Sequence, residues 1–306
     1  MRMLVVGAGS TGGYFGGRLA QAGRDITFLV RPARAQLLRT NGLQIVSPHG
    51  DFAIEPRLVT AGGIGESFDL ILLAVKAFAL KAALEDLAPA VGPGTMILPL
   101  LNGMRHMELL CARYGEQAVV GCVCKISTVV DERDRIVQLS TLQNISYGER
   151  DGSVSARMGL VDTFMQGAGF DTRLSSTITR DMWEKWVLLS TLGAATCLMR
   201  GNIGEIVAAQ GGADFVLRLI DEVTCVAVAS GVPPSDKFLL EAKTQLTAKG
   251  SPFAASMYRD LQRGNRIEAD QIVGDLLLRG KNAGVATPLL AAAYTHLDVY
   301  QRRIGA

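Results

Sequence analysis

Two features of this sequence combine residue types and spacings that suit chemistry. The first is LVVGAGSTGG, near the N-terminus, which contains Gly7, Gly9 and Gly12 in the spacing G-x-G-x-x-G. The second is Lys185, which is followed by a run of uncharged residues from Trp186 to Met199. A glycine-rich turn before a helix can bind phosphate groups, and a lysine in apolar surroundings can be a proton donor. The sequence therefore predicts an anionic ligand and a lysine-dependent reaction.

The glycine spacing follows an apolar strand and precedes a helix, which is the context of a dinucleotide fingerprint. Gly7 permits the tight turn, Gly9 lets the backbone approach a pyrophosphate, and Gly12 allows the helix to pack closely. Ser10 and Thr11 lie between these glycines and are further candidate contacts of the cofactor. A chance glycine-rich turn is the alternative interpretation.

The end of the second strand indicates which dinucleotide is bound. NAD enzymes usually have an acidic residue there that hydrogen-bonds the ribose 2'-hydroxyl. In this sequence the strand Asp25–Val30 is followed by Arg31, with Arg34 nearby and no acid. A guanidinium can pair with a 2'-phosphate, so we expect NADP (NADPH) rather than NAD, although a solvated loop arginine is the alternative.

Lys185 is the residue most in need of an explanation. A charged lysine among apolar side chains is costly unless it reaches solvent, pairs with a carboxylate or lowers its pKa. Extension of its ammonium to solvent is the alternative to a functional role. In the functional interpretation, Lys185 hydrogen-bonds a ketone oxygen and donates a proton as a hydride arrives at the carbon.

The elements that position these residues change character along the chain. From Met3 to about Arg173, short apolar runs alternate with helical stretches, which predicts an α/β fold with a parallel sheet covered on both faces. IVQLS and QNISYG predict two further short strands. From Ile178 onward the pattern is helical. We therefore expect a dinucleotide-binding domain at residues 1–174 and an all-helical substrate domain at residues 175–306.

Composition excludes several classes of partner. The chain has 306 residues, with 31 Lys+Arg against 29 Asp+Glu, and this net charge of +2 favours a small-molecule ligand over nucleic acid or a membrane surface. The five cysteines and three histidines form no zinc-binding spacing, so no metal site is predicted. No apolar run is long enough for a membrane helix and no signal peptide is recognised, so we expect a cytoplasmic protein.

Five segments together resemble the ketopantoate reductases (2-dehydropantoate 2-reductases). They are the glycine loop, LLAVKAF with Lys76, LLNGM with Asn102, WEKW with Lys185, and SPFAASMYRDLQRGNRIEAD with Ser256 and Glu268. The resemblance covers nearly the whole chain. It implies a Rossmann-type doubly wound sheet followed by a helical C-terminal domain similar to that of 6-phosphogluconate dehydrogenase.

The resemblance also implies roles for individual residues. Lys185 would be the catalytic general acid, and Glu268 the carboxylate that orients it. Asn102 and Ser256 would contact the substrate, and Lys76 would lie between cofactor and substrate. The implied reaction is the reduction of 2-dehydropantoate (ketopantoate) to pantoate by NADPH, a step of pantothenate and coenzyme A synthesis.

Lys76 and Asn102 each follow an apolar strand, at the edge of the sheet where ligands of open α/β folds lie. An exposed strand-end lysine is the alternative for Lys76, and an ordinary Asn-Gly turn is the alternative for Asn102. If Asn102 is functional, its amide could contact the ribose, the nicotinamide or the substrate.

Glu268 is predicted to lie on one long helix, in a stripe with Leu261, Asn265 and Ile272 at three- and four-residue spacing. This stripe would direct the carboxylate inward, whereas a solvated glutamate is the alternative. Ser256 lies near the start of that helix, where a hydroxyl can cap the helix or bind an anion.

The sequence departs from the family pattern beside Lys185. Family members have asparagines four and eight residues after the catalytic lysine, and this chain has Leu189 and Gly193 there. We expect a more apolar and roomier pocket, although ketopantoate remains the first choice of substrate. The alternatives are a related reductase of another keto acid, a 3-hydroxyacid-type dehydrogenase, and a non-catalytic NADP-binding regulator. The assembly is left open, with a homodimer as one option.

Overall fold

The computed structural model describes residues 1–305, which form two compact units. The N-terminal unit contains residues 1–101 and 106–179. The helical unit contains residues 102–105 together with the chain from residue 180 onward. Each unit has its own hydrophobic core. The segment 102–105 thus belongs to the helical unit although it lies within the sequence of the N-terminal unit.

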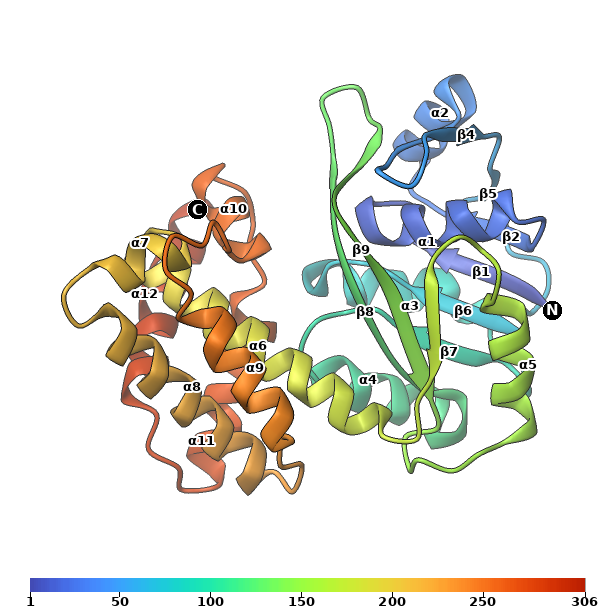
Figure 1. Cartoon of the computed structure of the whole chain (residues 1–306). Helices are drawn as coiled ribbons and strands as arrows, with labels where there is room; N and C mark the ends of the chain where they lie inside the picture. The colour runs from blue at the N-terminus through green and yellow to red at the C-terminus, as the bar shows by residue number, and fades with distance from the viewer. Residues whose placement is uncertain (306) are drawn as a thin grey trace. The chain divides into compact units, whose positions relative to one another are not determined.

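The main sheet of the N-terminal unit has five parallel strands in the order β5-β2-β1-β6-β7 (Figure 1). The strands are β1 (Arg2–Val6), β2 (Asp25–Leu29), β5 (Arg57–Val59), β6 (Leu70–Leu73) and β7 (Met96–Pro99). The associated helices are α1 (Ser10–Gln21), α2 (Pro32–Asn41), α3 (Leu80–Leu87) and α4 (Arg105–Tyr114). Short 3-10 turns lie at Ala77–Ala79, Ala88–Ala90 and Glu116–Ala118. This order confirms the predicted Rossmann-type sheet, and it reverses at β1, where such folds bind ligands.

A second sheet completes the N-terminal unit, with the order β10-β9-β3-β4 and with β8 antiparallel to β9 (Figure 1). Its strands are β3 (Leu43–Val46), β4 (Phe52–Ile54), β8 (Gly121–Val130), β9 (Ile136–Gly148) and β10 (Asp171–Leu174), and helix α5 spans Ala156–Met165. The two short strands predicted from IVQLS and QNISYG are one continuous strand, β9. The prediction was wrong because the linking residues, Thr141 and Leu142, favour strand structure and contain no turn-forming glycine or proline.

Helix α1 packs against both sheets through glycines. A Cβ atom added to Gly16 would lie 2.7 Å from a ring carbon of Phe28 in β2. A Cβ atom added to Gly17 would lie 2.8 Å from Cδ1 of Ile45 in β3. Larger residues on these two faces would displace the helix, so its glycines fix the position of the helix that follows the phosphate loop.

Every element assigned among residues 180–305 is helical (Figure 1). The helices are α6 (Ile178–Met199), α7 (Ile203–Ala208), α8 (Gly212–Ala229), α9 (Asp236–Leu246), α10 (Ser256–Gln262), α11 (Asp275–Asn282) and α12 (Pro288–Gly305), with a π-helical turn at Asp270–Gly274. The core centres on α6, where the Trp186 indole is 1% exposed and donates to the Ile272 carbonyl at 2.8 Å. The predicted helical C-terminal region is confirmed.

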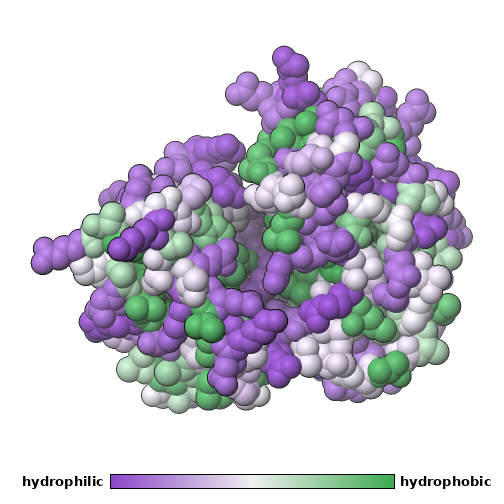
Figure 2. All heavy atoms as spheres, viewed as in Figure 1, coloured by the Kyte–Doolittle hydropathy of each residue, from purple (hydrophilic) through white to green (hydrophobic). Residues whose placement is uncertain are grey.

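The surface is mixed in character. Figure 2 shows hydrophobic residues scattered among hydrophilic ones on the face it presents. Individual apolar side chains such as Val154 (87% exposed) and Leu240 (72% exposed) reach solvent. Within residues 1–305, none of the helices combines the length and apolar character needed to cross a bilayer.

Candidate active site

The glycine loop connects β1 to α1 at the point where the strand order reverses. Gly7 has a φ angle of +96°, and its N–H donates to the Leu29 carbonyl at 3.0 Å. A Cβ atom at Gly7 would lie 2.9 Å from the Ala74 carbonyl oxygen, and one at Gly12 would collide with the Gly7 carbonyl oxygen. These two positions therefore require glycine, as the spacing predicted.

Gly9 differs from its neighbours because it is exposed and has an ordinary φ angle of −83°. A Cβ atom there would have no neighbour within 4 Å. Gly9 is the N-cap of α1, without a capping side chain, and the first helical bond runs from the Gly13 N–H to its carbonyl at 2.8 Å. The N–H groups of Ser10 and Thr11 precede that bond. This open helix end fits the pyrophosphate of a dinucleotide.

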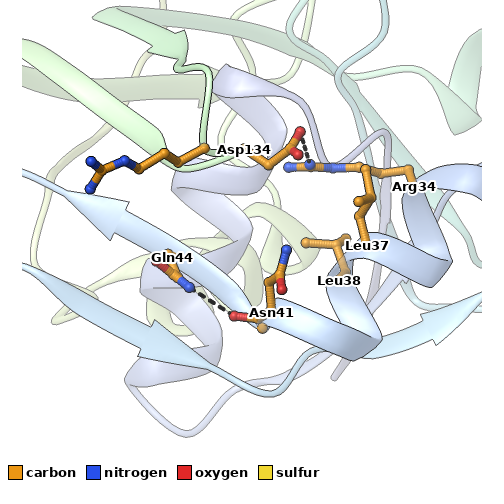
Figure 3. A pocket seen from close by; sticks show the side chains of 8 residues that line it. Arg34, Leu37, Leu38, Asn41, Gln44 and Asp134 are labelled. Carbon is orange, nitrogen blue, oxygen red and sulfur yellow. Dashed lines mark hydrogen bonds and ion pairs between the residues drawn. The ribbon is translucent and has the colours of Figure 1, made fainter.

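The two arginines after β2 lie in different environments. Arg31 is the exposed N-cap residue of α2. Arg34 is half-buried, and its guanidinium donates to the Ala8 carbonyl at 3.3 Å and to the Asp134 carboxylate at 3.2 Å. Figure 3 shows Arg34 directed toward Asp134. The Arg34 guanidinium is therefore bound within the protein, whereas Arg31 is exposed.

A cavity lies where α2 approaches the turn between β8 and β9. It is lined by Arg34, Leu37, Leu38, Asn41, Gly42, Gln44, Arg133 and Asp134 (Figure 3). Its volume of about 10 Å³ is at the lower limit for one water molecule. This space is therefore too small for a nucleotide.

Lys76 lies three residues beyond the end of β6, the strand that pairs with β1. It is exposed and precedes the 3-10 turn Ala77–Ala79. The Ala74 N–H donates to the Val6 carbonyl at 3.0 Å, which fixes this chain segment beside the glycine loop. The structure thus brings Lys76 to the same edge of the sheet as the phosphate loop.

Asn102 follows β7 but belongs to the helical unit. Its carbonyl accepts a hydrogen bond of 3.0 Å from the side-chain amide of Gln271, which is 6% exposed. Gly103 has a φ angle of +82°, and a Cβ atom there would lie 2.6 Å from the Gln271 carbonyl oxygen. Gln271, in the π-helical turn, was not predicted from the sequence, because it is separated from Asn102 by 169 residues.

Lys185 lies on α6 and is half-buried, next to Trp186 and one turn after Met182, both of which are buried. Its side chain makes no hydrogen bond or ion pair with any of residues 1–305. The adjacent acid, Glu184, accepts hydrogen bonds from the Ser235 N–H at 2.8 Å and from its hydroxyl at 2.7 Å. The neighbouring carboxylate is therefore committed to the start of α9.

Glu268 does not lie within a long helix, and this prediction was wrong. Helix α10 ends at Gln262, and Gly264 has a φ angle of +71°, which interrupts the helical path. Glu268 is half-buried in the segment before the next helix, where its carbonyl accepts a bond of 3.0 Å from the Ile272 N–H. Glu268 therefore lies just before a helical turn and is not part of an apolar stripe along one helix.

Ser256 is the first residue of α10, and its side chain is exposed. The N-cap residue of this helix is Ala255, and no side chain caps the helix. Capping by Ser256, one of the two roles expected at this position, is therefore not observed. Its hydroxyl lies at a helix N-terminus, where anion binding is favoured.

The position of Gly193 corrects another expectation. Gly193 is buried, and a Cβ atom there would lie 2.8 Å from Cε of Met257, itself 3% exposed. The predicted extra room is therefore filled by the Met257 thioether. Leu189, one turn nearer Lys185, is half-buried.

The predicted site residues divide between the two units. The phosphate loop, Arg31 and Lys76 are in the N-terminal unit, whereas Asn102, Lys185, Ser256 and Glu268 are in the helical unit. A family model described as ketopantoate reductase PanE/ApbA matches residues 3–152, and the model of its C-terminal part matches residues 177–301. The chain belongs to the ketopantoate reductase family.

Relatives of this ketopantoate reductase family member match it along nearly its whole length. The uncharacterized oxidoreductase YkpB of Bacillus subtilis is 34% identical over 301 residues, covering 98% of this chain and 99% of that protein. A 2-dehydropantoate 2-reductase of Halobacterium salinarum is 26% identical over 308 residues, covering 99% of each.

A solved structure agrees with these matches. The 2-dehydropantoate 2-reductase of Geobacter metallireducens has a TM-score of 0.88 and 27% identity, covering 98% of this chain and 99% of that chain. The predicted family is thereby confirmed. The chain is a dinucleotide-dependent oxidoreductase of the 2-dehydropantoate 2-reductase type.

Proposed function

We propose that this enzyme uses NADPH to reduce the keto group of a 2-keto acid, giving the 2-hydroxy acid. The observation that carries the proposal is Lys185, a half-buried lysine that directly precedes the uncharged part of helix α6. Ketopantoate, which would become pantoate, is the first substrate to test, because the relative from Halobacterium salinarum is a 2-dehydropantoate 2-reductase.

The N-terminal unit would hold the cofactor. The open helix end at Gly9, Ser10 and Thr11 suits its pyrophosphate, because backbone N–H groups and the helix dipole favour an anion. The exposed guanidinium of Arg31 suits the 2'-phosphate. Lys76, at the same sheet edge, would approach the nicotinamide half.

The helical unit would supply the groups that act on the substrate. When bound, NADPH supplies a hydride, with both electrons, to the keto carbon and leaves as NADP⁺. Lys185 donates a proton to the keto oxygen as the carbonyl π electrons move onto it, and is reprotonated from solvent. Asn102 and Ser256 would hold the substrate, and Glu268 would orient the lysine.

A second candidate is the same reaction on a different 2-keto acid. Leu189 and the Met257-filled space at Gly193 favour it, because they leave apolar groups on the helix face that carries Lys185.

The test is the loss of NADPH absorbance when ketopantoate, pyruvate or 2-ketoisovalerate is added to the purified protein, with NADH as the cofactor control. We expect oxidation of NADPH, and slower oxidation of NADH, with at least one keto acid. Binding of NADPH without turnover of any keto acid would refute the proposal.

A further inference from the structure

The face of α6 that carries Lys185 is apolar beyond the lysine. Residues four and eight positions along a helix lie on nearly the same face, so Leu189 and Gly193 follow Lys185 in that order. Leu188 and Leu198 pack against the core of the helical unit. Leu189 is half-buried and is not one of the residues of that core. Its side chain is therefore available to a ligand that Lys185 contacts.

The next position along this face is filled by another apolar group. A Cβ atom at Gly193 would lie 2.8 Å from the Met257 Cε and 4.0 Å from the Ala255 Cβ. The Met257 side chain thus covers the glycine, and the absence of a side chain at Gly193 makes room for it. Gly193 is buried and Met257, at 3% exposure, belongs to the core, so Leu189 is the partly exposed apolar residue of this face after Lys185.

The hydroxyl groups of α6 are used within the helix. Ser190 donates to the Trp186 carbonyl at 2.7 Å, and Thr191 donates to the Val187 carbonyl at 2.8 Å. Thr196 donates to the Leu192 carbonyl at 2.6 Å. All three side chains are fully buried. Beyond Lys185, α6 therefore presents no hydroxyl to a substrate.

We propose that Leu189 determines substrate specificity, and that it selects a 2-keto acid whose substituent is branched, apolar and without a hydroxyl. This inference rests on the proposed function, in which Lys185 contacts the keto oxygen. The carboxylate common to all 2-keto acids would meet the polar groups of the helical unit, Asn102 and Ser256. The substituent on the other side of the keto group would meet the Leu189 side chain.

Two substrates that differ by one group test this directly. Trimethylpyruvate lacks only the terminal hydroxyl of ketopantoate. An apolar site leaves that hydroxyl without a partner, so we expect kcat/KM to be about tenfold higher for trimethylpyruvate. A site built to bond the hydroxyl would instead favour ketopantoate by about 10⁴-fold.

The variant Leu189→Asn places an amide on the face of Lys185. We expect it to raise the ratio of kcat/KM for ketopantoate to that for trimethylpyruvate by about tenfold, because the amide can bond the hydroxyl. Leu240→Asn, at a side chain 72% exposed on α9, is the matched control and should leave the ratio unchanged. Melting temperatures identify a variant that fails to fold. In that case the inference is tested by the kcat/KM ratio of the wild-type enzyme for the two substrates.

The outcomes separate the two proposals. Preference for trimethylpyruvate, reversed or reduced by Leu189→Asn, supports the inference. Preference of the wild-type enzyme for ketopantoate overturns it and leaves the proposed function standing. Turnover of neither compound, nor of pyruvate or 2-ketoisovalerate, overturns the proposed function itself.

Discussion

Lys185 is the residue to which the proposed mechanism assigns proton donation. Replacing it by alanine would remove the proposed donor, so we expect Lys185→Ala to lower kcat by about 10² to 10⁴. NADPH binding should be nearly unchanged, because the phosphate loop and Arg31 lie in the other unit. Steady-state kinetics and fluorescence titration with NADPH measure the two quantities.

Lys237→Ala is the matched control, because Lys237 is an exposed lysine on a helix of the same unit. It should leave both kcat and NADPH affinity at the wild-type values. Unchanged turnover in Lys185→Ala would remove Lys185 from the mechanism.

The proposed role of Arg31 predicts how its removal affects the choice between NADPH and NADH. If its guanidinium binds the 2'-phosphate, Arg31→Ala should weaken NADPH binding about tenfold, the loss of one charge-assisted hydrogen bond at an exposed site. NADH binding should change little, since NADH has a hydroxyl in place of that phosphate. Arg39→Ala, at another exposed arginine of α2, serves as the control. Equal losses for both cofactors would contradict the assignment.

Individual residues were predictable where their signal is local. The glycine spacing indicated Gly7 and Gly12, because strand, turn and helix are adjacent in the sequence. The environment of Glu268 was not predicted, since the apolar stripe concealed the break at Gly264. A glycine followed by Asn265 was the signal for that break. The Met257 contact with Gly193 joins residues far apart in sequence and left no such signal.

At the scale of elements, two glycines of the phosphate loop have different roles: Gly12 is needed for packing, and Gly9 is proposed to leave room for the cofactor. Gly12→Ala should lower the free energy of unfolding by about 1 to 3 kcal/mol, because the new Cβ collides with the Gly7 carbonyl oxygen. Gly9→Ala should change stability by less than about 0.5 kcal/mol, since its Cβ meets open space. It should nevertheless weaken NADPH binding, because the methyl group occupies the approach of the pyrophosphate. Chemical denaturation measures the free energy of unfolding of both variants, and titration with NADPH measures their cofactor affinity. Wild-type NADPH affinity in Gly9→Ala would contradict this binding mode.

The turn that carries Asn102 gives a second prediction for an element. Gly103→Ala should displace this turn from Gln271 and lower kcat/KM by about 10², the effect of a misplacement near 1 Å. Gly284→Ala is the matched control, because Gly284 has a similar φ angle of +69° but no neighbour within 4 Å of a Cβ atom. The control isolates the backbone strain of a positive φ angle. Equal kinetic parameters in the two variants would show that the contact with Gln271 does not position Asn102.

Most elements were predictable because their hydrophobic periodicity is strong. Strands β6 and β7 of the parallel sheet are short and fully buried, and their apolar runs are plain in the sequence. Strand β9 was divided in two by prediction because its middle residues face solvent and interrupt the apolar pattern. The bond between Asn102 and Gln271 could not be predicted, because local patterns do not report pairing between distant segments.

At the scale of the whole molecule, the fold was predicted from the order of the elements along the chain. Alternation of strands and helices followed by helices alone predicted the α/β region and the helical region, and both are confirmed. The grouping of residues 102–105 with the helical unit was not predicted, because it depends on tertiary contacts. The fold can therefore be predicted from the pattern of apolar residues in the sequence. Substrate preference cannot, because it depends on side chains that folding brings together.

The central claim is that this enzyme transfers a hydride from NADPH to the carbon of a 2-keto group. The most direct measurement uses NADPH deuterated at the transferable position of the nicotinamide C4, with mass spectrometry of the hydroxy acid formed from trimethylpyruvate or ketopantoate. The account predicts one deuterium on the carbinol carbon of every product molecule, and correspondingly less of this product from Lys185→Ala than from the wild-type enzyme. Product without deuterium at that carbon, or bound NADPH with no product from either keto acid, would contradict it.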